Sequence, residues 1–259
     1  MAMAGQDVPC PCHLIRARPS GASNSPRGCV MNAPVRRLIK PTTPRTVHLL
    51  NISTLDRPVQ AEASTEADFV RLAALCPSVK CIEAQPCTLD LGGRRFTPDY
   101  RIECHSGVSS YWEVKLEKRF DKYRPLFNDA ARHLASLGAR FYAVSNLSLR
   151  RGDQHHVAAL IHRYGKARPA EADLERVLQA AQDFRKGCPA ASLAARAQVP
   201  LELIYHLIAR RRLTFRRRVG VHDLLILPEH LENQDDLQLA SWLDVSPWRT
   251  DAGTGARAA

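Results

Sequence analysis

The spacing of apolar residues predicts alternating helices and strands in the first two thirds of the chain. Apolar positions recur at helical spacing from Ser64 to the residue before Pro77, and further helices are predicted over 125–137 and 153–164. Short apolar runs between turn residues predict strands over residues 79–85, 87–91, 95–104, 110–116 and 140–145. This order predicts an α/β fold in which helices flank a mixed sheet.

A polar linker around Pro169 separates this region from a second, helical one. Helices are predicted over residues 172–184, 189–197 and 200–210. The tight turn Gln198-Val199 between the last two is typical of a helix-turn-helix. Residues 213–218 and 221–227 are predicted to pair as a β-hairpin around Gly220. We therefore expect a winged-helix-like C-terminal domain.

The two ends of the chain lack this periodicity. Residues 1–45 are rich in Pro, Arg, Ser and Ala and are expected to form a disordered basic arm. Residues 231–259 are acidic and then rich in Pro, Gly and Ala, which predicts a flexible tail with a short docking helix over Leu237–Leu243. The α/β domain is accordingly predicted over 46–168 and the winged-helix domain over 169–230.

The chain is basic, with a formal net charge of +11 and a pI of about 9.6. Such an excess of positive charge is typical of proteins that bind nucleic acids. No apolar stretch approaches the ~20 residues of a membrane helix, and the N-terminus lacks the apolar core of a signal peptide, so we expect a cytoplasmic protein. The candidate DNA-binding residues are Arg94, Arg95, Arg210, Arg211, Arg212, Arg216, Arg217 and Arg218. The alternatives are solvated arginines on a hairpin and a C-terminal domain that binds another protein.

The eight cysteines follow no spacing typical of a zinc site or a disulfide framework. Four of them lie in apolar stretches, where cysteine is most often a small buried hydrophobe: Cys76, Cys81, Cys87 and Cys104. The adjacent His155 and His156 lie in a predicted helix and are not expected to face one metal ion. We therefore expect reduced thiols and no structural zinc.

Two short segments carry the candidate chemistry, Thr97-Pro98-Asp99-Tyr100 and Tyr111-Trp112-Glu113-Val114-Lys115. Strand side chains alternate between faces, so Glu113 and Lys115 point the same way. A hairpin return can bring Asp99 alongside them. Two carboxylates and an ammonium group are the minimum set for hydrolysis of a phosphodiester with Mg²⁺ or Mn²⁺. The sequence therefore predicts a nuclease.

Asp99 and Glu113 are the predicted metal ligands, because hard cations prefer carboxylate oxygens. Lys115 is expected to orient or deprotonate the attacking water, or to stabilise charge on the phosphate. Glu66 either completes the metal site from its helix or is a first-turn carboxylate favoured by the helix dipole. The other residues also have structural interpretations: a turn aspartate, a solvated strand glutamate and an edge-strand lysine. Gln85 is a candidate for supporting the site, and a structural hydrogen-bonding role is the main expectation for it.

These residues resemble the PD-(D/E)xK nucleases and, more closely, TnsA, the endonuclease subunit of heteromeric cut-and-paste transposases. The resemblance covers roughly residues 35–230 and is carried by Glu66, Pro98-Asp99, Glu113-Val114-Lys115, Phe141-Tyr142-Ala143-Val144, Ser64-Thr65-Glu66 and Glu83-Ala84-Gln85-Pro86. Some family members have an amide at the position of Glu113, so metal binding here is inferred from its carboxylate.

The resemblance implies a restriction-endonuclease-like fold and hydrolysis of double-stranded DNA at the 5′ ends of a transposon. It also implies two partners, a DDE-type transposase that cuts the other strand and an AAA+ ATPase. Two alternatives remain open: a stand-alone restriction or repair nuclease on the same fold, and a winged-helix DNA-binding regulator whose nuclease site is idle.

Overall fold

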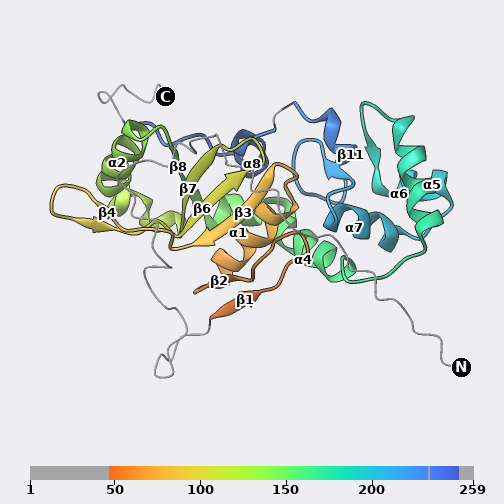
Figure 1. Ribbon diagram of the computed structural model, residues 1–259, viewed down its shortest axis with the longest axis horizontal. Helices are drawn as coiled ribbons and strands as arrows, with labels where there is room; N and C mark the ends of the chain where they lie inside the picture. The colour runs from red at the N-terminus through yellow and green to blue at the C-terminus, as the bar shows by residue number, and fades with distance from the viewer. Residues whose placement is uncertain (1–46, 233, 251–259) are drawn as a thin grey trace, which may run out of the picture.

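The computed structural model describes residues 47–232 and 234–250, which form two adjoining units (Figure 1). One unit is built on a four-stranded sheet, and the other is mainly helical. The predicted arm, residues 1–45, lies outside the described residues. Within the described ranges, no helix combines the length and the apolar character that crossing a lipid bilayer requires.

The central sheet has the strand order β3-β6-β7-β8. Its strands are β3 (Val79–Ala84), β6 (Tyr100–Cys104), β7 (Ser109–Lys115) and β8 (Arg140–Ser145). The first three strands are antiparallel neighbours, whereas β7 and β8 run parallel. A helix connects β7 to β8, as a parallel pair requires, because a tight hairpin joins only antiparallel strands. The predicted mixed sheet is confirmed.

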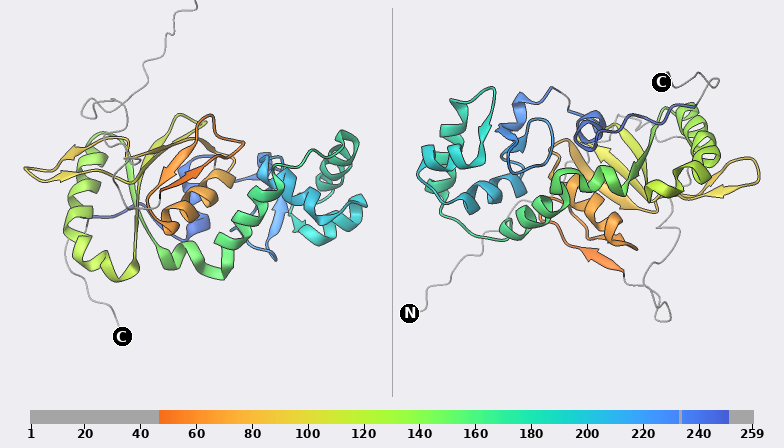
Figure 2. Two further views of the ribbon diagram at one scale, coloured as in Figure 1. Left: turned by 90° about the horizontal axis from the view of Figure 1, so that it is seen from below. Right: turned by 180° about the vertical axis from the view of Figure 1, so that it is seen from behind.

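Helices cover both faces of this sheet (Figure 2). Helices α1 (Ser64–Leu75) and α4 (Gln154–Tyr164) share one hydrophobic core with Trp112, and α2 (Phe120–Ser136) shares a second core with Tyr111. Because successive strand side chains point to opposite faces, these neighbouring aromatic residues anchor opposite layers. The expected α/β sandwich of helices around a sheet is therefore present.

The segment that leads into the site contains two strands in place of one. The sequence predicts a single strand over 95–104, but the structure has β5 (Arg95–Phe96), a break, and then β6. Pro98 lies in the break, and proline cannot donate a ladder hydrogen bond. Strand β5 pairs with β4 (Leu89–Asp90) in a projecting hairpin (Figure 1). This break frees Asp99 from regular strand pairing.

Several short elements of this unit are absent from the sequence-based prediction. They are β1 (His48–Leu50), β2 (Val59–Ala61), α3 (Asn146–Arg150) and the 3₁₀ turns Glu117–Arg119 and Arg151–Asp153. Strands β1 and β2 form an antiparallel ribbon that packs against α1.

The second unit contains three helices, α5 (Glu171–Gln182), α6 (Ala190–Ala197) and α7 (Leu201–Ala209). Helix α7 also packs against α4 of the first unit, so the two units share one hydrophobic core. Residue Gln198, between α6 and α7, has a left-handed backbone with φ of 54°, which turns the chain sharply.

A small antiparallel sheet completes the second unit. Its order is β10-β11-β9, with β9 (Cys188–Pro189), β10 (Thr214–Phe215) and β11 (Leu224–Ile226). The predicted pairing of 213–218 with 221–227 is confirmed in its central part. The 3₁₀ turn Pro228–His230 follows β11.

The segment expected to be a flexible tail is ordered where the structure describes it. Helix α8 (Asp236–Leu243) contains the predicted docking helix. Asp236 is fully buried, forms an ion pair with Arg140 of β8, and accepts a 2.8 Å hydrogen bond from the Tyr142 hydroxyl. At the other end of α8, Trp242 packs edge-on against Phe215 of β10. Helix α8 therefore contacts both units, which corrects the tail prediction for its described part.

Candidate active site

The break before β6 brings Asp99 next to Glu113. Tyr100 pairs with Trp112 in the sheet, so the residue before Tyr100 lies beside the residue after Trp112. The Asp99 amide donates a 3.2 Å hydrogen bond to Glu113 Oε2, and the Val114 amide donates a 2.8 Å bond to Asp99 Oδ2. Each carboxylate is thus held by backbone donors of the neighbouring segment.

Lys115 completes this cluster from the same face of β7 as Glu113. Its Nζ lies 3.4 Å from Asp99 Oδ2 and forms an ion pair with Glu113 Oε1. The ammonium group also lies 5.9 Å from the centre of the Tyr123 ring in α2. The structure therefore brings together Asp99, Glu113 and Lys115, as the alternation along β7 predicts.

Glu66 approaches the same cluster from the first turn of α1. Its Oε2 accepts a 2.8 Å hydrogen bond from the Glu62 amide and lies 3.5 Å from the Tyr100 hydroxyl. That hydroxyl also donates to the Gln60 carbonyl at 3.0 Å. Glu66 is close enough to Asp99 for the charge of one carboxylate to affect the other. This position fits a first-turn carboxylate, whereas Glu66, Asp99 and Glu113 do not bring one ligand atom each within 4.8 Å of the others.

Burial makes the carboxylates of the cluster hard to ionise. Burial, together with the charge of Asp99, raises the pKa of Glu113 to about 8 and that of Glu66 to about 7. Burial also raises the pKa of Asp99, although Lys115 opposes this shift. For Lys115, burial lowers the pKa, but Glu113 and Asp99 outweigh it and raise the pKa overall. The cluster thus has one cation for three acids, of which Glu113 is buried and Asp99 and Glu66 are half-buried.

The donor set fits a hard divalent cation. Three carboxyl groups supply oxygen atoms, the ligands that Mg²⁺ and Mn²⁺ prefer. A divalent cation would also compensate the negative charge that raises the carboxyl pKa values, and its binding would release their protons. Asp99 and Glu113 are the residues that would hold it, and Glu66 would join them only if its side chain moved closer, because one ligand atom from each of the three does not lie within 4.8 Å of the others.

No protein-family model and no curated protein matches this chain. The site is therefore interpreted from its own geometry.

Two residues lie at the rim of the site: Glu62, which the sequence pattern did not assign to it, and Gln85, a candidate for supporting it. Glu62 lies between β2 and α1 and accepts a 3.4 Å hydrogen bond from Gln85 Nε2. Gln85, whose backbone is left-handed with φ of 47°, donates its amide to the Asp99 carbonyl at 2.8 Å. This contact agrees with the structural role expected for Gln85. Glu62 shows no sequence signal that separates it from other exposed acids.

The predicted DNA-binding arginines divide into exposed and internal groups. Arg94 and Arg95 lie on the β4–β5 hairpin, where Arg94 forms an ion pair with Asp129 of α2. The exposed residues at the C-terminal unit are Arg210, Arg212, Arg216, Arg217 and Arg218.

Arg211 is a correction to this set. Its Nε donates to the Ala74 carbonyl at 2.9 Å, and its Nη1 donates to the Val79 carbonyl. Burial lowers the pKa of Arg211 to about 10. The guanidinium group ties the end of α7 to α1 and β3, so it is not available to DNA.

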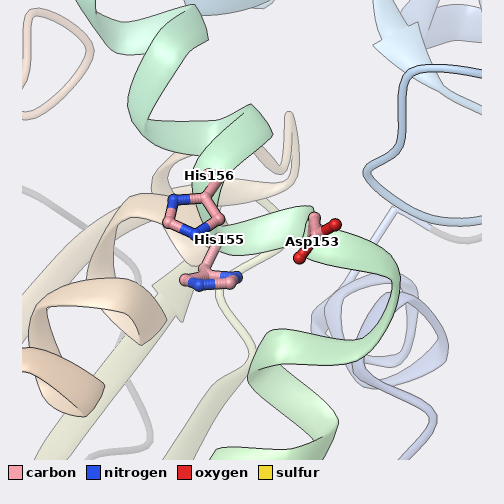
Figure 3. A group of neighbouring side chains, drawn as sticks. All are labelled: Asp153, His155 and His156. Carbon is pink, nitrogen blue, oxygen red and sulfur yellow. The ribbon is translucent and has the colours of Figure 1, made fainter.

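A second group of potential metal ligands lies at the start of α4 (Figure 3). One ligand atom each from Asp153, His155 and His156 lies within 4.8 Å of the others. The expectation that the two histidines cannot face one ion is therefore wrong, because their rings lie 3.9 Å apart, centre to centre. Asp153 and His156 are exposed, and exposed groups of this kind commonly hold no ion.

Burial was predicted for four cysteines, and the structure confirms it for three of them. Cys76, Cys87 and Cys104 are buried, whereas Cys81 is exposed on the edge strand β3. All four are free thiols.

Proposed function

We propose that this protein is a metal-dependent DNA endonuclease with Asp99, Glu113 and Lys115 at its active site. The observation that carries the proposal is the convergence of a buried carboxylate and an ammonium group on β7 with the half-buried carboxylate of Asp99, just before the neighbouring strand β6. A divalent cation bound by these carboxylates would supply a Lewis acid and lower the pKa of a bound water. This is the chemistry that phosphodiester hydrolysis requires.

Lys115 is assigned to charge stabilisation. Its ammonium group contacts Asp99 and Glu113, and their charges raise its pKa. A lysine that stays protonated near neutral pH is a poor base but a good partner for negative charge that develops on a phosphate. In-line attack by water on that phosphate would leave 5′-phosphate and 3′-hydroxyl ends. Glu66 is proposed as a further ligand on the α1 side.

The architecture supports a more specific assignment. An antiparallel pair of strands followed by a helix and a parallel strand is consistent with a restriction-endonuclease-like fold. Helices α6 and α7 with the β10–β11 hairpin are consistent with a winged-helix-like unit. With the resemblance of residues 35–230 to TnsA, these features support an endonuclease subunit of a heteromeric transposase. Double-stranded transposon ends, a DDE-type transposase and an AAA+ ATPase are the proposed partners.

The test is cleavage of transposon-end DNA in Mg²⁺ and in Mn²⁺, by the full chain alone and with a co-expressed DDE transposase. Wild type is compared with Asp99→Asn, which removes a charge without changing side-chain size. Asp121→Asn is the matched control, because Asp121 lies on α2 with 93% of its side chain exposed. We expect cleavage at the 5′ ends by wild type and Asp121→Asn only.

Other outcomes select the alternatives. Equal cleavage by wild type and Asp99→Asn would place the active site elsewhere. Cleavage that needs no partner and ignores transposon ends would favour a stand-alone restriction or repair nuclease. DNA binding without cleavage by any variant, with partners present, would favour a DNA-binding regulator with an idle site.

A further inference from the structure

Helix α7 corresponds to the recognition helix of the predicted helix-turn-helix, yet it is buried. Every residue from Leu203 to Ala209 is buried, because α7 packs against α4 on one side and against α5 and α6 on the other. His206 also contacts the Tyr164 carbonyl at 3.2 Å. A recognition helix must present side chains to base edges in the major groove. From Leu203 onward α7 has no exposed face with which to do so, and its one exposed residue is the acidic Glu202 of the first turn.

Five exposed cations of this unit line two adjoining cavities beside the small sheet: Arg185, Lys186, Arg216, Arg217 and Arg218. One cavity has a volume of about 370 Å³ and the other about 460 Å³, and Arg217 and Ser241 line both. We name the pair the basic trough. Its cationic lining residues are Arg151, Arg185, Lys186, Arg216, Arg217 and Arg218.

Hydrogen bonds fix the segment that carries the central arginines. Asp223 Oδ2 accepts the backbone amides of Arg217 at 3.2 Å and of Arg218 at 2.7 Å. Arg216 Nη1 donates to the Lys186 carbonyl at 2.9 Å, which links β10 to the loop before β9. The carboxylate of Asp223 therefore accepts bonds from the backbone and not from the side chains of Arg217 and Arg218, which remain exposed.

The charges of the trough are only partly balanced by its own acids. Its other carboxylates belong to Glu232 and Asp244, and Asp244 pairs with Arg151. Among the described residues, no carboxylate forms an ion pair with the side chains of the remaining cationic members, which are Arg185, Lys186, Arg216, Arg217 and Arg218. Strong unpaired cations in a polar hollow attract anions, and guanidinium groups match phosphate oxygens in geometry.

We propose that the basic trough binds successive phosphate groups of a DNA backbone, and that α7 reads no bases. This inference rests on the proposed function, which makes DNA the substrate. A polymer is favoured over a single phosphate because the cations line two adjoining cavities that meet at Arg217. Phosphate contacts hold and orient DNA but carry no direct sequence information. The C-terminal unit would therefore bind DNA without sequence specificity.

The experiment measures the affinity of the full chain for 30-base-pair duplexes in EDTA, at several salt concentrations. The trough variant carries Arg185→Ala, Arg217→Ala and Arg218→Ala. A control variant, with Arg168→Ala, Arg176→Ala and Arg196→Ala, loses the same charge from exposed positions outside the trough. Thermal unfolding of both variants checks that they are folded.

We expect the trough variant alone to bind more weakly, by a similar factor on duplexes of unrelated sequence. Each lost phosphate contact should reduce the slope of log K against log salt by about 0.9, so the loss of three should reduce it by about 3. Equal effects of the two variants, an effect confined to one sequence, or no DNA binding by wild type would overturn the proposal. Displacement of DNA by millimolar pyrophosphate would point to a small phosphate ligand and would also overturn it. Because EDTA prevents cleavage, these results do not depend on whether the metal site is active.

Discussion

The buried carboxyl group of Glu113 should make the stability of the metal-free protein fall as pH rises. Only 3% of this residue is exposed, and burial with the charge of Asp99 raises its pKa to about 8. In the unfolded chain, a glutamate ionises near pH ~4.3. Between these two pH values the folded state binds a proton that the unfolded state does not, so stability decreases with increasing pH.

The free energy of unfolding falls by about 1.36 kcal/mol per pH unit for each proton that the folded state binds and the unfolded state does not. Between pH 6 and pH 8.5, Glu113 ionises in the folded state near pH 8, which corresponds to a loss of about 3 kcal/mol. Glu66, with its pKa raised to about 7, adds about 1 kcal/mol. Wild type should therefore lose about 4 kcal/mol of its free energy of unfolding over this range.

Urea unfolding in EDTA at both pH values tests this prediction. Glu113→Gln removes the ionisable group at similar volume, so this variant should lose only about 1 kcal/mol, the share of Glu66. Glu117→Gln is the matched control, because Glu117 is exposed two residues beyond the site, and it should behave as wild type. If Glu113→Gln and wild type lost equal stability, Glu113 would not be the buried acid that the structure indicates.

Three further predictions concern stability and are measured by urea or thermal unfolding. Arg211→Ala should destabilise the fold by about 2–3 kcal/mol, because it removes the hydrogen bonds that the guanidinium group donates to the Ala74 and Val79 carbonyls. Arg212→Ala on the exposed side should change it by less than about 0.5 kcal/mol, and equal losses would contradict the internal position of Arg211. Asp236→Asn should cost about 1–3 kcal/mol, since it weakens the contacts of a buried carboxylate with Arg140 and Tyr142, while Arg140 is partly exposed and keeps Asp235 as a partner. A neutral result would show that the pair of Asp236 with Arg140 does not stabilise the fold. Gln198→Gly should stabilise the fold by about 0.5–1 kcal/mol by relieving its left-handed backbone, and a loss would show that the Gln198 side chain outweighs this relief.

The central strands of the fold were predictable because the pattern of apolar residues that indicates a strand lies within the strand itself. Strand β8 has a continuous apolar run, and β7 has Tyr111, Trp112 and Val114 at its centre, as expected for strands with helices on both faces. Helix α2 begins at Phe120, before the start predicted at Pro125, because this proline lies inside the helix. The convergence of Asp99, Glu113 and Lys115 was also predictable, since strand alternation and one hairpin register determine it.

Other features depend on tertiary packing that no local pattern encodes. No sequence signal separates Arg211 from its neighbours Arg210 and Arg212. The left-handed backbone of Arg211, with φ of 57°, directs its side chain inward. Glu62 reaches the site because the β1–β2 ribbon docks on α1. Burial of α7 follows from its contact with α4, and the spacing of its apolar residues could not distinguish two buried sides from one.

Helix α8 has a consequence for the way this chain folds. Its Asp236 completes β8 through contacts with Arg140 and Tyr142, which lie 96 and 94 residues earlier. Contacts of such long sequence separation form late, because the intervening chain must first be brought together. During synthesis, the sheet that carries the candidate site would remain incomplete until the C-terminal unit has emerged from the ribosome. A fragment that ends at the linker near residue 168 would leave Arg140 without its partner Asp236, so the proposed activity should require the whole chain and not a detachable module.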